Sequence, residues 1–275
     1  MPGRVTLDIA PASAVGTGGA GLIPEWQFNG VLGSPAAGGT RLTHIECGAE
    51  LWVREDRLVA GRGYRAASPR SRRELARVGA ILRLRARRRY HLHAAGAVDA
   101  AGRAWLLAGP TGSGKSTLAY ALARAGWRIL GDDGVIVELP TGGGALAHPW
   151  REPLRVCATL APAFAELRAI AWDRVAIPGD ARRRAEVPAP AASVAPIAGI
   201  VWLTQGPHDR LSPMRGADAL IELVRGSAWV LITDDASRQH LEALRRLATD
   251  VPSFRLVHSP AQLHAIASTI ASIRL

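Results

Sequence analysis

The stretch Gly109-Pro-Thr-Gly-Ser-Gly-Lys-Ser-Thr117 decides the fold of this 275-residue chain. It fits the pattern G-x-x-x-x-G-K-[ST], in which glycines let backbone N–H groups wrap a phosphate chain and the lysine contacts the phosphates. Lys115 is the only lysine among 34 Lys and Arg residues. A planar guanidinium cannot replace a compact ammonium in such a loop, which explains why a lysine is kept here alone. The nucleotide-binding residues that we predict are Gly109, Pro110, Thr111, Gly112, Ser113, Gly114, Lys115, Ser116 and Thr117.

The residues on either side of this motif give it the right structural context. Residues 104–108 are apolar and predict a strand, and residues 116–125 predict a helix that ends before Gly126. Strand, glycine-rich loop and helix together direct N–H donors and the positive end of the helix dipole at phosphate groups. The sequence therefore predicts that ATP binds here with Mg²⁺, with Lys115 screening the β- and γ-phosphates and the Ser116 hydroxyl on the metal.

Two adjacent acids follow the motif at a short distance. Asp132 and Asp133 come 17 and 18 residues after Lys115. We call the glycine-rich motif the P-loop and the strand before it, residues 104–108, the P-loop strand. We expect a helix and then a strand that returns beside the P-loop strand to bring both carboxylates near the phosphates. One would order Mg²⁺ while the other accepts the proton of the attacking hydroxyl. The alternative interpretation is a plain turn, because Asp-Asp-Gly is typical of turns.

A pair of histidines precedes the motif. Residues 90–98 predict one continuous strand, which would place His91 and His93 on the same face. A histidine beside the P-loop strand would hydrogen-bond an aspartate of the site and tune its basicity. Packing of both rings, or a metal site made by the pair, are the alternatives.

A second acidic pair competes with the first. Residues 229–233 predict an apolar strand that ends in Asp234 and Asp235, the general form of a Walker B strand. Alternatively, Thr233 or Asp234 caps the helix predicted over residues 237–247.

The remaining chain predicts a β-rich beginning and then alternating helices and strands. Nine arginines lie between Arg70 and Arg89, on a helix that Ser68 would cap and Pro69 would start. An apolar stripe on that helix indicates docking against a core, and the run lacks the aromatic residues that stack nucleic-acid bases. Further predicted helices cover residues 160–170, 217–225 and 260–273, further strands cover 127–139, 197–204 and 254–258, and loops cover 30–40 and 178–196.

Three segments resemble one known family. His93-Ala-Ala-Gly-Ala-Val98, the stretch 106–119 around the P-loop, and Ile129-Leu-Gly-Asp-Asp-Gly-Val135 are similar to the core of HPr kinase/phosphorylase, and more closely to the HPr-kinase-like serine kinases of bacterial gene clusters, including those that modify lasso-peptide precursors. The resemblance implies that Asp132 is the general base, that Asp133 helps to hold Mg²⁺ and that His93 orients Asp132. The glycine-rich signature associated with reverse phosphorolysis is not evident, so the resemblance implies neither HPr as the acceptor nor phosphorylase activity.

These observations predict an α/β fold. It would consist of a P-loop kinase core like the C-terminal domain of HPr kinase over residues 81–275, and a β-rich N-terminal region over residues 1–80 that ends in the Arg-rich helix. The predicted function is ATP-dependent transfer of the γ-phosphoryl group to a serine of a protein or peptide, with Asp132, His93 and Lys115 as catalytic residues and Ser116 and Asp133 as metal ligands. The alternatives are a small-molecule kinase of the shikimate- or gluconate-kinase type, with Arg182-Arg183-Arg184 as a phosphate-sensing lid, and a switch ATPase that uses Asp234 and Asp235.

Composition limits the partners and the compartment. The net charge of +11 invites a nucleic-acid partner, but we expect none. Asp8 and Pro11 interrupt any signal-peptide core, and no apolar run is long enough for a membrane span, so we expect a cytoplasmic protein without a membrane partner. Cys47 and Cys157 predict no disulfide framework. Self-association into a homo-oligomer is left open by the sequence.

Overall fold

The computed structural model describes residues 25–174, 183–232, 234–259 and 270. The chain divides into two compact units, Met1–Arg88 and Arg89–Leu275. Both mix helices with strands, and the N-terminal unit is rich in β-structure. The predicted helix over residues 260–273 lies almost wholly outside the described residues.

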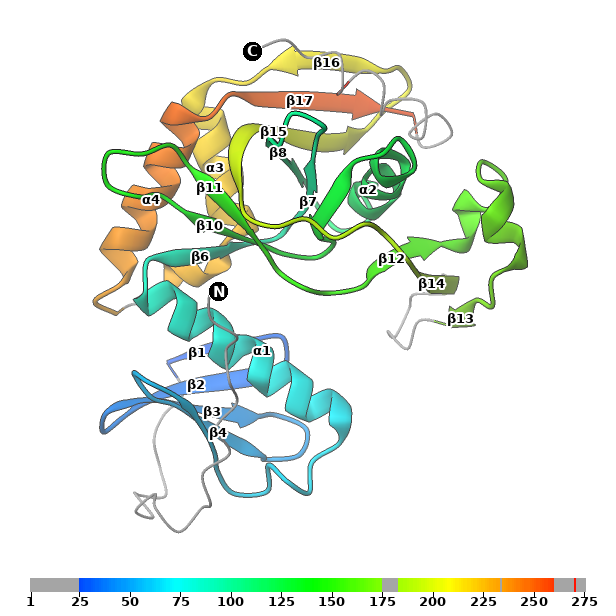
Figure 1. Cartoon of the computed structure of the whole chain (residues 1–275). Coiled ribbons are helices and arrows are strands. Elements are labelled where there is room, and N and C mark those ends of the chain that lie inside the picture. Colours follow the sequence, from blue (N-terminus) through cyan, green and yellow to red (C-terminus); the bar gives the residue numbers. More distant parts are fainter. Residues whose placement is uncertain (1–24, 175–182, 233, 260–269, 271–275) are drawn as a thin grey trace. The chain divides into compact units, whose positions relative to one another are not determined.

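The N-terminal unit is an antiparallel meander with one helix packed on it (Figure 1). The strands pair in chain order and are β1 (Trp26–Phe28), β2 (Val31–Ala36), β3 (Gly39–His44), β4 (Glu50–Val53) and β5 (Leu58–Ala60). The loop predicted over residues 30–40 is therefore wrong. Ala36 pairs with Gly39 across a tight turn in which Gly38 has φ +72°, so this Gly- and Ala-rich stretch is a hairpin.

The Arg-rich helix forms as predicted. Helix α1 (Pro69–Ala86) is capped by Ser68, whose hydroxyl accepts a hydrogen bond from the Ser71 amide at 3.1 Å. Its stripe of Leu75, Val78 and Ile81 is buried. Arg83 and Arg85 are buried as well, and Arg83 donates to the carbonyl of Asp56, so part of the positive charge of this helix is used within the unit.

The second unit is built on a mixed nine-stranded sheet. The order is β6-β10-β11-β15-β8-β7-β9, and β17 pairs with β15 and with β16. The strands are β6 (Arg89–Leu92), β7 (Ala94–Val98), β8 (Ala104–Ala108), β9 (Arg128–Gly131), β10 (Val135–Glu138), β11 (Leu146–Pro149), β15 (Ala195–Gln205), β16 (Arg210–Pro213) and β17 (Ser253–His258). At its centre β15 runs parallel to both β8 and β17.

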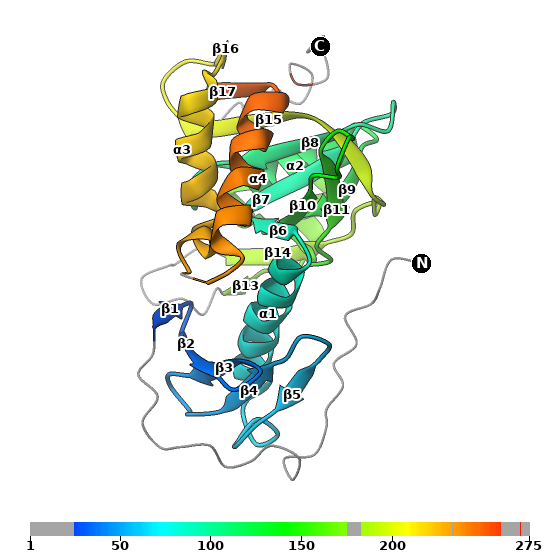
Figure 2. The same ribbon diagram turned by 90° about the vertical axis from the view of Figure 1, so that its left-hand side faces the viewer.

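Helices cover both faces of this sheet. Alternate residues of β8 and β15 point to opposite faces. Leu107 and Leu203 pack with α2 (Lys115–Arg124) in one core, while Leu106 and Trp202 belong to the core under two other helices. Those helices are α3 (Gly216–Gly226) and α4 (Ser237–Asp250), which lie side by side in Figure 2. A three-stranded sheet of β12 (Leu154–Cys157), β14 (Arg183–Val187) and β13 (Asp173–Arg174) completes the unit next to α2.

Several predictions about secondary structure in this unit are wrong. The helix predicted over residues 160–170 is not formed, and the structure has two short 3-10 turns instead, η2 (Ala158–Leu160) and η3 (Ala165–Ala169). Within the loop predicted over residues 178–196, β14 is an ordered strand. The predicted strand at residues 229–233 is instead the 3-10 turn η4 (Ala228–Leu231), in which Leu231 is 70% exposed while its neighbours are buried.

Candidate nucleotide and phosphoryl-transfer site

The glycine-rich motif forms a tight loop between β8 and α2. Gly109, Gly112 and Gly114 have φ values of +140°, +83° and +97°, in the region that favours glycine. Gly114 is also the N-terminal cap of α2, and no side chain caps this helix. Its first N–H groups are therefore available to an anion, which the helix dipole would favour.

Lys115 lies across this loop. Its Nζ donates to the carbonyls of Gly109 at 2.8 Å and Pro110 at 3.1 Å. Burial lowers the pKa of the ammonium, and the charges of Asp133 and Asp132 oppose that shift. Lys115 is thus a buried cation held at the loop and facing two acids, which is the arrangement needed to screen a bound phosphate.

Residues far along the chain fix the loop from its other side. Gln205 at the end of β15 donates to the Gly112 carbonyl at 2.8 Å. His258 at the end of β17 hydrogen-bonds the Ser113 carbonyl, also at 2.8 Å. Because β15 and β17 run parallel to β8, their carboxyl ends meet the P-loop at one edge of the sheet. Neither contact could be predicted from the sequence, because the bonded residues lie 93 and 145 positions apart in the chain.

The Asp132-Asp133 pair reaches the same edge by a different route from the predicted one. The strand predicted over residues 127–139 is two strands, β9 and β10, that break at Asp132-Asp133-Gly134. Moreover, β9 pairs with β7 and not with the P-loop strand β8. Two successive antiparallel pairings make β9 run in the direction of β8, so both strands end at the same edge. The expectation that β9 lies directly beside β8 is wrong, whereas the acids do reach the loop.

Asp132 is buried close to the first residues of α2. Its side chain is only 6% exposed, and its Oδ2 accepts the Arg155 amide N–H at 2.9 Å. Its Oδ1 is buried without a hydrogen-bond partner of normal geometry in the described chain. Burial raises the pKa of this carboxyl, while the Arg155 amide and the nearby Ser116 hydroxyl partly offset the rise. Asp132 and Ser116 thus present oxygens next to each other.

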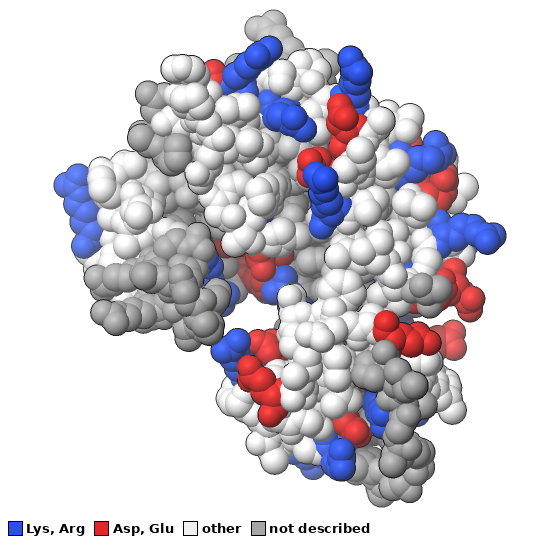
Figure 3. All heavy atoms as spheres, turned by 180° about the vertical axis from the view of Figure 1, so that it is seen from behind, with Lys and Arg blue, Asp and Glu red and all other residues white. Residues whose placement is uncertain are grey.

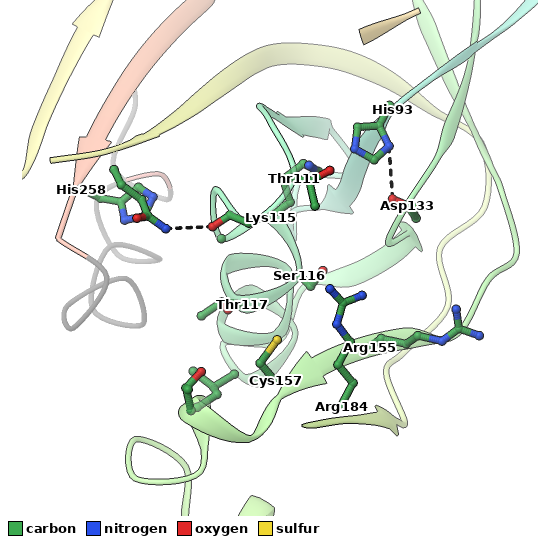
Figure 4. A pocket seen from close by; sticks show the side chains of 15 residues that line it. His93, Thr111, Lys115, Ser116, Thr117, Asp133, Arg155, Cys157, Arg184 and His258 are labelled. Carbon is green, nitrogen blue, oxygen red and sulfur yellow. Dashed lines mark hydrogen bonds and ion pairs between the residues drawn. The ribbon is translucent and has the colours of Figure 1, made fainter. Parts of the chain in front are cut away.

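Asp133 points toward His93. His93 Nδ1 lies 3.2 Å from Asp133 Oδ1, and the two side chains are 36% and 51% exposed (Figure 4). The prediction that His93 orients Asp132 is therefore corrected, because its partner is Asp133. The side chain of Asp133 is accessible to a substrate, whereas that of Asp132 is not.

The two histidines do not share one strand. The chain breaks at His93 between β6 and β7, which pair with different neighbours, and the His93 amide donates to the Gly226 carbonyl at 2.9 Å. His91 is buried, and its ring packs edge-on against Trp150 with centroids 5.2 Å apart. Across the part of the chain that the structure describes, no cluster of three His, Cys, Asp or Glu side chains is placed to hold a metal.

The loop and Asp133 line a cavity of about 490 Å³, which we call the nucleotide cavity (Figure 4). Arg155 and Arg184 lie on its β12–β14 side, and Arg155 is also paired with Glu186 at 2.9 Å. Arg184 was predicted as part of a loop, but it stands on β14 opposite Cys157. The side chain of Arg183 and the whole of Arg182 lie outside the described residues. The volume lies within the range of small-ligand pockets.

The second acidic pair lies elsewhere. Neither Asp234 nor Asp235 is among the described residues that line the nucleotide cavity. Asp234 Oδ1 accepts the Ala236 amide at 3.0 Å, and the Asp234 amide donates to Ser237 Oγ at 3.0 Å, at the start of α4. The predicted cap is not formed, because the residue immediately before the helix is Ala236 and no described side chain caps α4. Asp234 and Ser237 instead close a turn just before the helix. Without the predicted strand there is no Walker B element at this position.

The face shown in Figure 3 carries charged side chains of both signs. Basic and acidic side chains are interspersed there, and no broad basic patch of described residues forms. Several arginines are paired with acids, as Arg70 is with Glu74 and Arg245 is with Glu242.

Within the described residues, no helix is both long and apolar enough to cross a membrane.

Comparisons with known proteins add little. No protein-family model matches the chain, and no curated protein sequence matches it. One solved structure that is similar is the Hpr(Ser) kinase/phosphatase from Coxiella burnetii, with 14% sequence identity and a TM-score of 0.35. The match covers 66% of this chain and 87% of that one. Likeness at this level establishes neither the family nor the activity of the chain.

Proposed function

We propose that this protein is an ATP-dependent phosphotransferase whose acceptor is a serine hydroxyl of a protein or peptide. The observation that carries the proposal is an arrangement at one edge of the sheet. There the single lysine of the chain lies in a P-loop and faces two aspartates, of which Asp132 is buried and Asp133 is exposed. The loop N–H groups and Lys115 would bind the β- and γ-phosphates, and the nucleotide would occupy the nucleotide cavity.

The buried acid and the adjacent hydroxyl fit a magnesium ion. Asp132 Oδ1 is buried without a hydrogen-bond partner of normal geometry, and Ser116 lies close enough to affect the pKa of the carboxyl. Carboxylate and hydroxyl oxygens are ligands that Mg²⁺ accepts, usually together with waters and phosphate oxygens. When bound, Mg²⁺ would neutralise the charge that develops on the phosphate oxygens. Asp132 would therefore take the metal role that the family resemblance implies for Asp133.

The accessible acid fits the general base. Asp133 would accept the serine proton as the serine oxygen forms a bond to the γ-phosphorus and the bond to the β–γ bridging oxygen breaks, which leaves ADP. His93 would hold the Asp133 carboxylate in orientation through the 3.2 Å contact. The two aspartates thus exchange the roles that the family resemblance implies.

Serine in a peptide or protein is the finer part of the proposal, supported by the sequence resemblance to HPr-kinase-like serine kinases. A switch ATPase is disfavoured because Asp234 and Asp235 lie at the start of α4 and do not line the nucleotide cavity. A small-molecule kinase remains the competing class.

Turnover measurements separate these classes. We expect slow ATP hydrolysis by the protein alone, and labelling from γ-³²P-ATP when a lysate of the producing cells is added. The label should depend on Mg²⁺ and reside in a polypeptide. Fast hydrolysis without any acceptor would place the chain among ATPases, and label found only in small molecules would support the small-molecule class.

A further inference from the structure

A second cavity adjoins the P-loop on the side of the sheet covered by α3. It has a volume of about 550 Å³ and shares His93 and Thr111 with the nucleotide cavity, and we call it the α3 cavity. Trp202 in its wall belongs to the core beneath α3 and α4, whereas the nucleotide cavity is walled by α2, β12 and β14 residues. The P-loop, the proposed base Asp133 and its partner His93 therefore lie between two cavities.

His93 contacts one residue from each cavity. Its backbone amide is hydrogen-bonded to the carbonyl of Gly226, the last residue of α3, at 2.9 Å. Its ring contacts Asp133 at 3.2 Å. Gly226 lines the α3 cavity and Asp133 lines the nucleotide cavity. A hydroxyl that enters from the α3 cavity would thus arrive at the base beside the P-loop.

The α3 cavity contains a cation, Arg255, that pairs with no acid among the described residues. Arg255 is exposed and makes no hydrogen bond or ion pair with any described part of the chain. It is opposite Trp202 in the register of β17 and β15, so both side chains lie on the α3 face. Arg225, in contrast, is paired with Glu222 at 3.1 Å. A free guanidinium in a cavity wall is suited to bind a carboxylate.

A buried donor adds to this wall. Trp202 is 5% exposed, and its indole Nε1–H has no hydrogen-bond partner in the described chain. Buried polar groups in folded proteins nearly always have a partner, so an unpaired one in a cavity wall points to a ligand or water that supplies it. The wall therefore places a cation beside the ring of Trp202, whose buried N–H has no partner in the described chain.

We propose that the α3 cavity is the acceptor site, and that it binds a peptide segment whose serine lies at His93 and Asp133 while a nearby Asp or Glu pairs with Arg255. This proposal rests on the proposed phosphotransferase function and adds the substrate preference. The volume suits a few residues and not a folded domain. Exposed Thr204, Arg225 and Arg255 in the wall leave the cavity open to solvent, so a chain can enter and leave it.

The test uses a degenerate peptide library with a fixed central serine, γ-³²P-ATP and the full-length protein. We expect peptides with Asp or Glu near the serine to be labelled preferentially. Arg255→Gln should reduce that preference about tenfold, the effect of losing about 1.4 kcal/mol of charge-assisted binding, and should leave the KM for ATP unchanged. Arg245→Gln is the matched control, because Arg245 is an exposed arginine on α4 that lines neither cavity, and the preference should survive in it.

A pair of bulky substitutions then separates the two cavities. Thr204→Trp should block peptide labelling while the Kd for a fluorescent ATP analogue stays the same, since Thr204 lines only the α3 cavity. Thr159→Trp, in the nucleotide cavity, should raise the Kd for the same ATP analogue. The proposal is overturned if labelling shows no acidic preference, if Thr204→Trp labels peptides as well as the wild type, or if the protein binds ATP yet labels only hydroxy acids or nothing. Failure of the wild type to bind ATP would instead overturn the proposed function itself.

Discussion

Replacing Asp132 by asparagine should stabilise the metal-free protein while it weakens the dependence of activity on magnesium. The side chain is almost fully buried, and asparagine has the same shape. Its amide oxygen can still accept the Arg155 N–H that now binds Oδ2 at 2.9 Å. What the substitution removes is a desolvated negative charge whose other oxygen has no partner of normal hydrogen-bond geometry. A buried polar group without a partner costs about 1–3 kcal/mol.

We therefore expect a gain of about 1 kcal/mol at pH 7, which corresponds to roughly 2–4 °C in Tm for a unit of this size. The sign depends on pH. Burial raises the pKa of Asp132 in the folded state, so the wild type loses stability as pH rises from the unfolded value of 3.8 through the higher folded pKa. The Tm difference should accordingly vanish below about pH 4 and be complete above the folded pKa.

The assay is thermal unfolding by calorimetry in EDTA at several pH values, together with the magnesium dependence of transfer at saturating ATP. The apparent Mg²⁺ affinity should fall by roughly 10–100-fold in Asp132→Asn. The matched control is Asp133→Asn, which should change Tm little because Asp133 is half exposed, and should lower kcat by about 10²–10⁴-fold because the base is lost. A lower Tm for Asp132→Asn at pH 7, combined with an unchanged magnesium dependence, would refute the reasoning.

Three further predictions concern neighbouring positions. His93→Gln should lower kcat severalfold and shift the acidic limb of the pH–rate profile without changing ATP affinity. His91→Gln, at a buried position, should cost about 1–2 kcal/mol of stability in urea unfolding and leave kcat unchanged. Equal kinetic losses at both positions would contradict this prediction. Gly109→Ala should abolish binding of a fluorescent ATP analogue, because φ is +140° there and a Cβ would lie 2.6 Å from the Leu203 carbonyl oxygen; normal affinity would show that the loop is misplaced. Asp234→Asn should cost at most about 1 kcal/mol in unfolding free energy with full activity retained, and loss of transfer in this variant would restore the ATPase alternative.

Local patterns in the sequence predicted the local structure well. The P-loop, its strand and its helix follow from the spacing of glycines, apolar residues and Lys115, and α1 follows from Ser68-Pro69 and an apolar stripe. These features depend on residues within a few positions of one another, so a single sequence contains the information.

Contacts between distant segments decided the rest. Residues 90–98 have the composition of one strand, but the bond from the His93 amide to Gly226, 133 residues later, marks the break that turns His93 toward Asp133. Likewise, the Arg155 amide is what distinguishes Asp132 from its neighbour. Adjacent aspartates are indistinguishable by spacing, and only tertiary packing buries one and exposes the other. For that reason the sequence could identify the acidic pair but could not assign its two roles.

The most direct test of the proposed function is phosphoamino-acid identification after incubation with γ-³²P-ATP, Mg²⁺ and a lysate of the producing cells. We predict that wild-type protein places the label in phosphoserine. Lys115→Arg, which keeps the positive charge, should abolish the label because a guanidinium does not fit the loop. Asp133→Asn should abolish it while ATP still binds. Label that persists in Lys115→Arg, or that appears only as free phosphate in the wild type, would contradict phosphoryl transfer from this P-loop to serine.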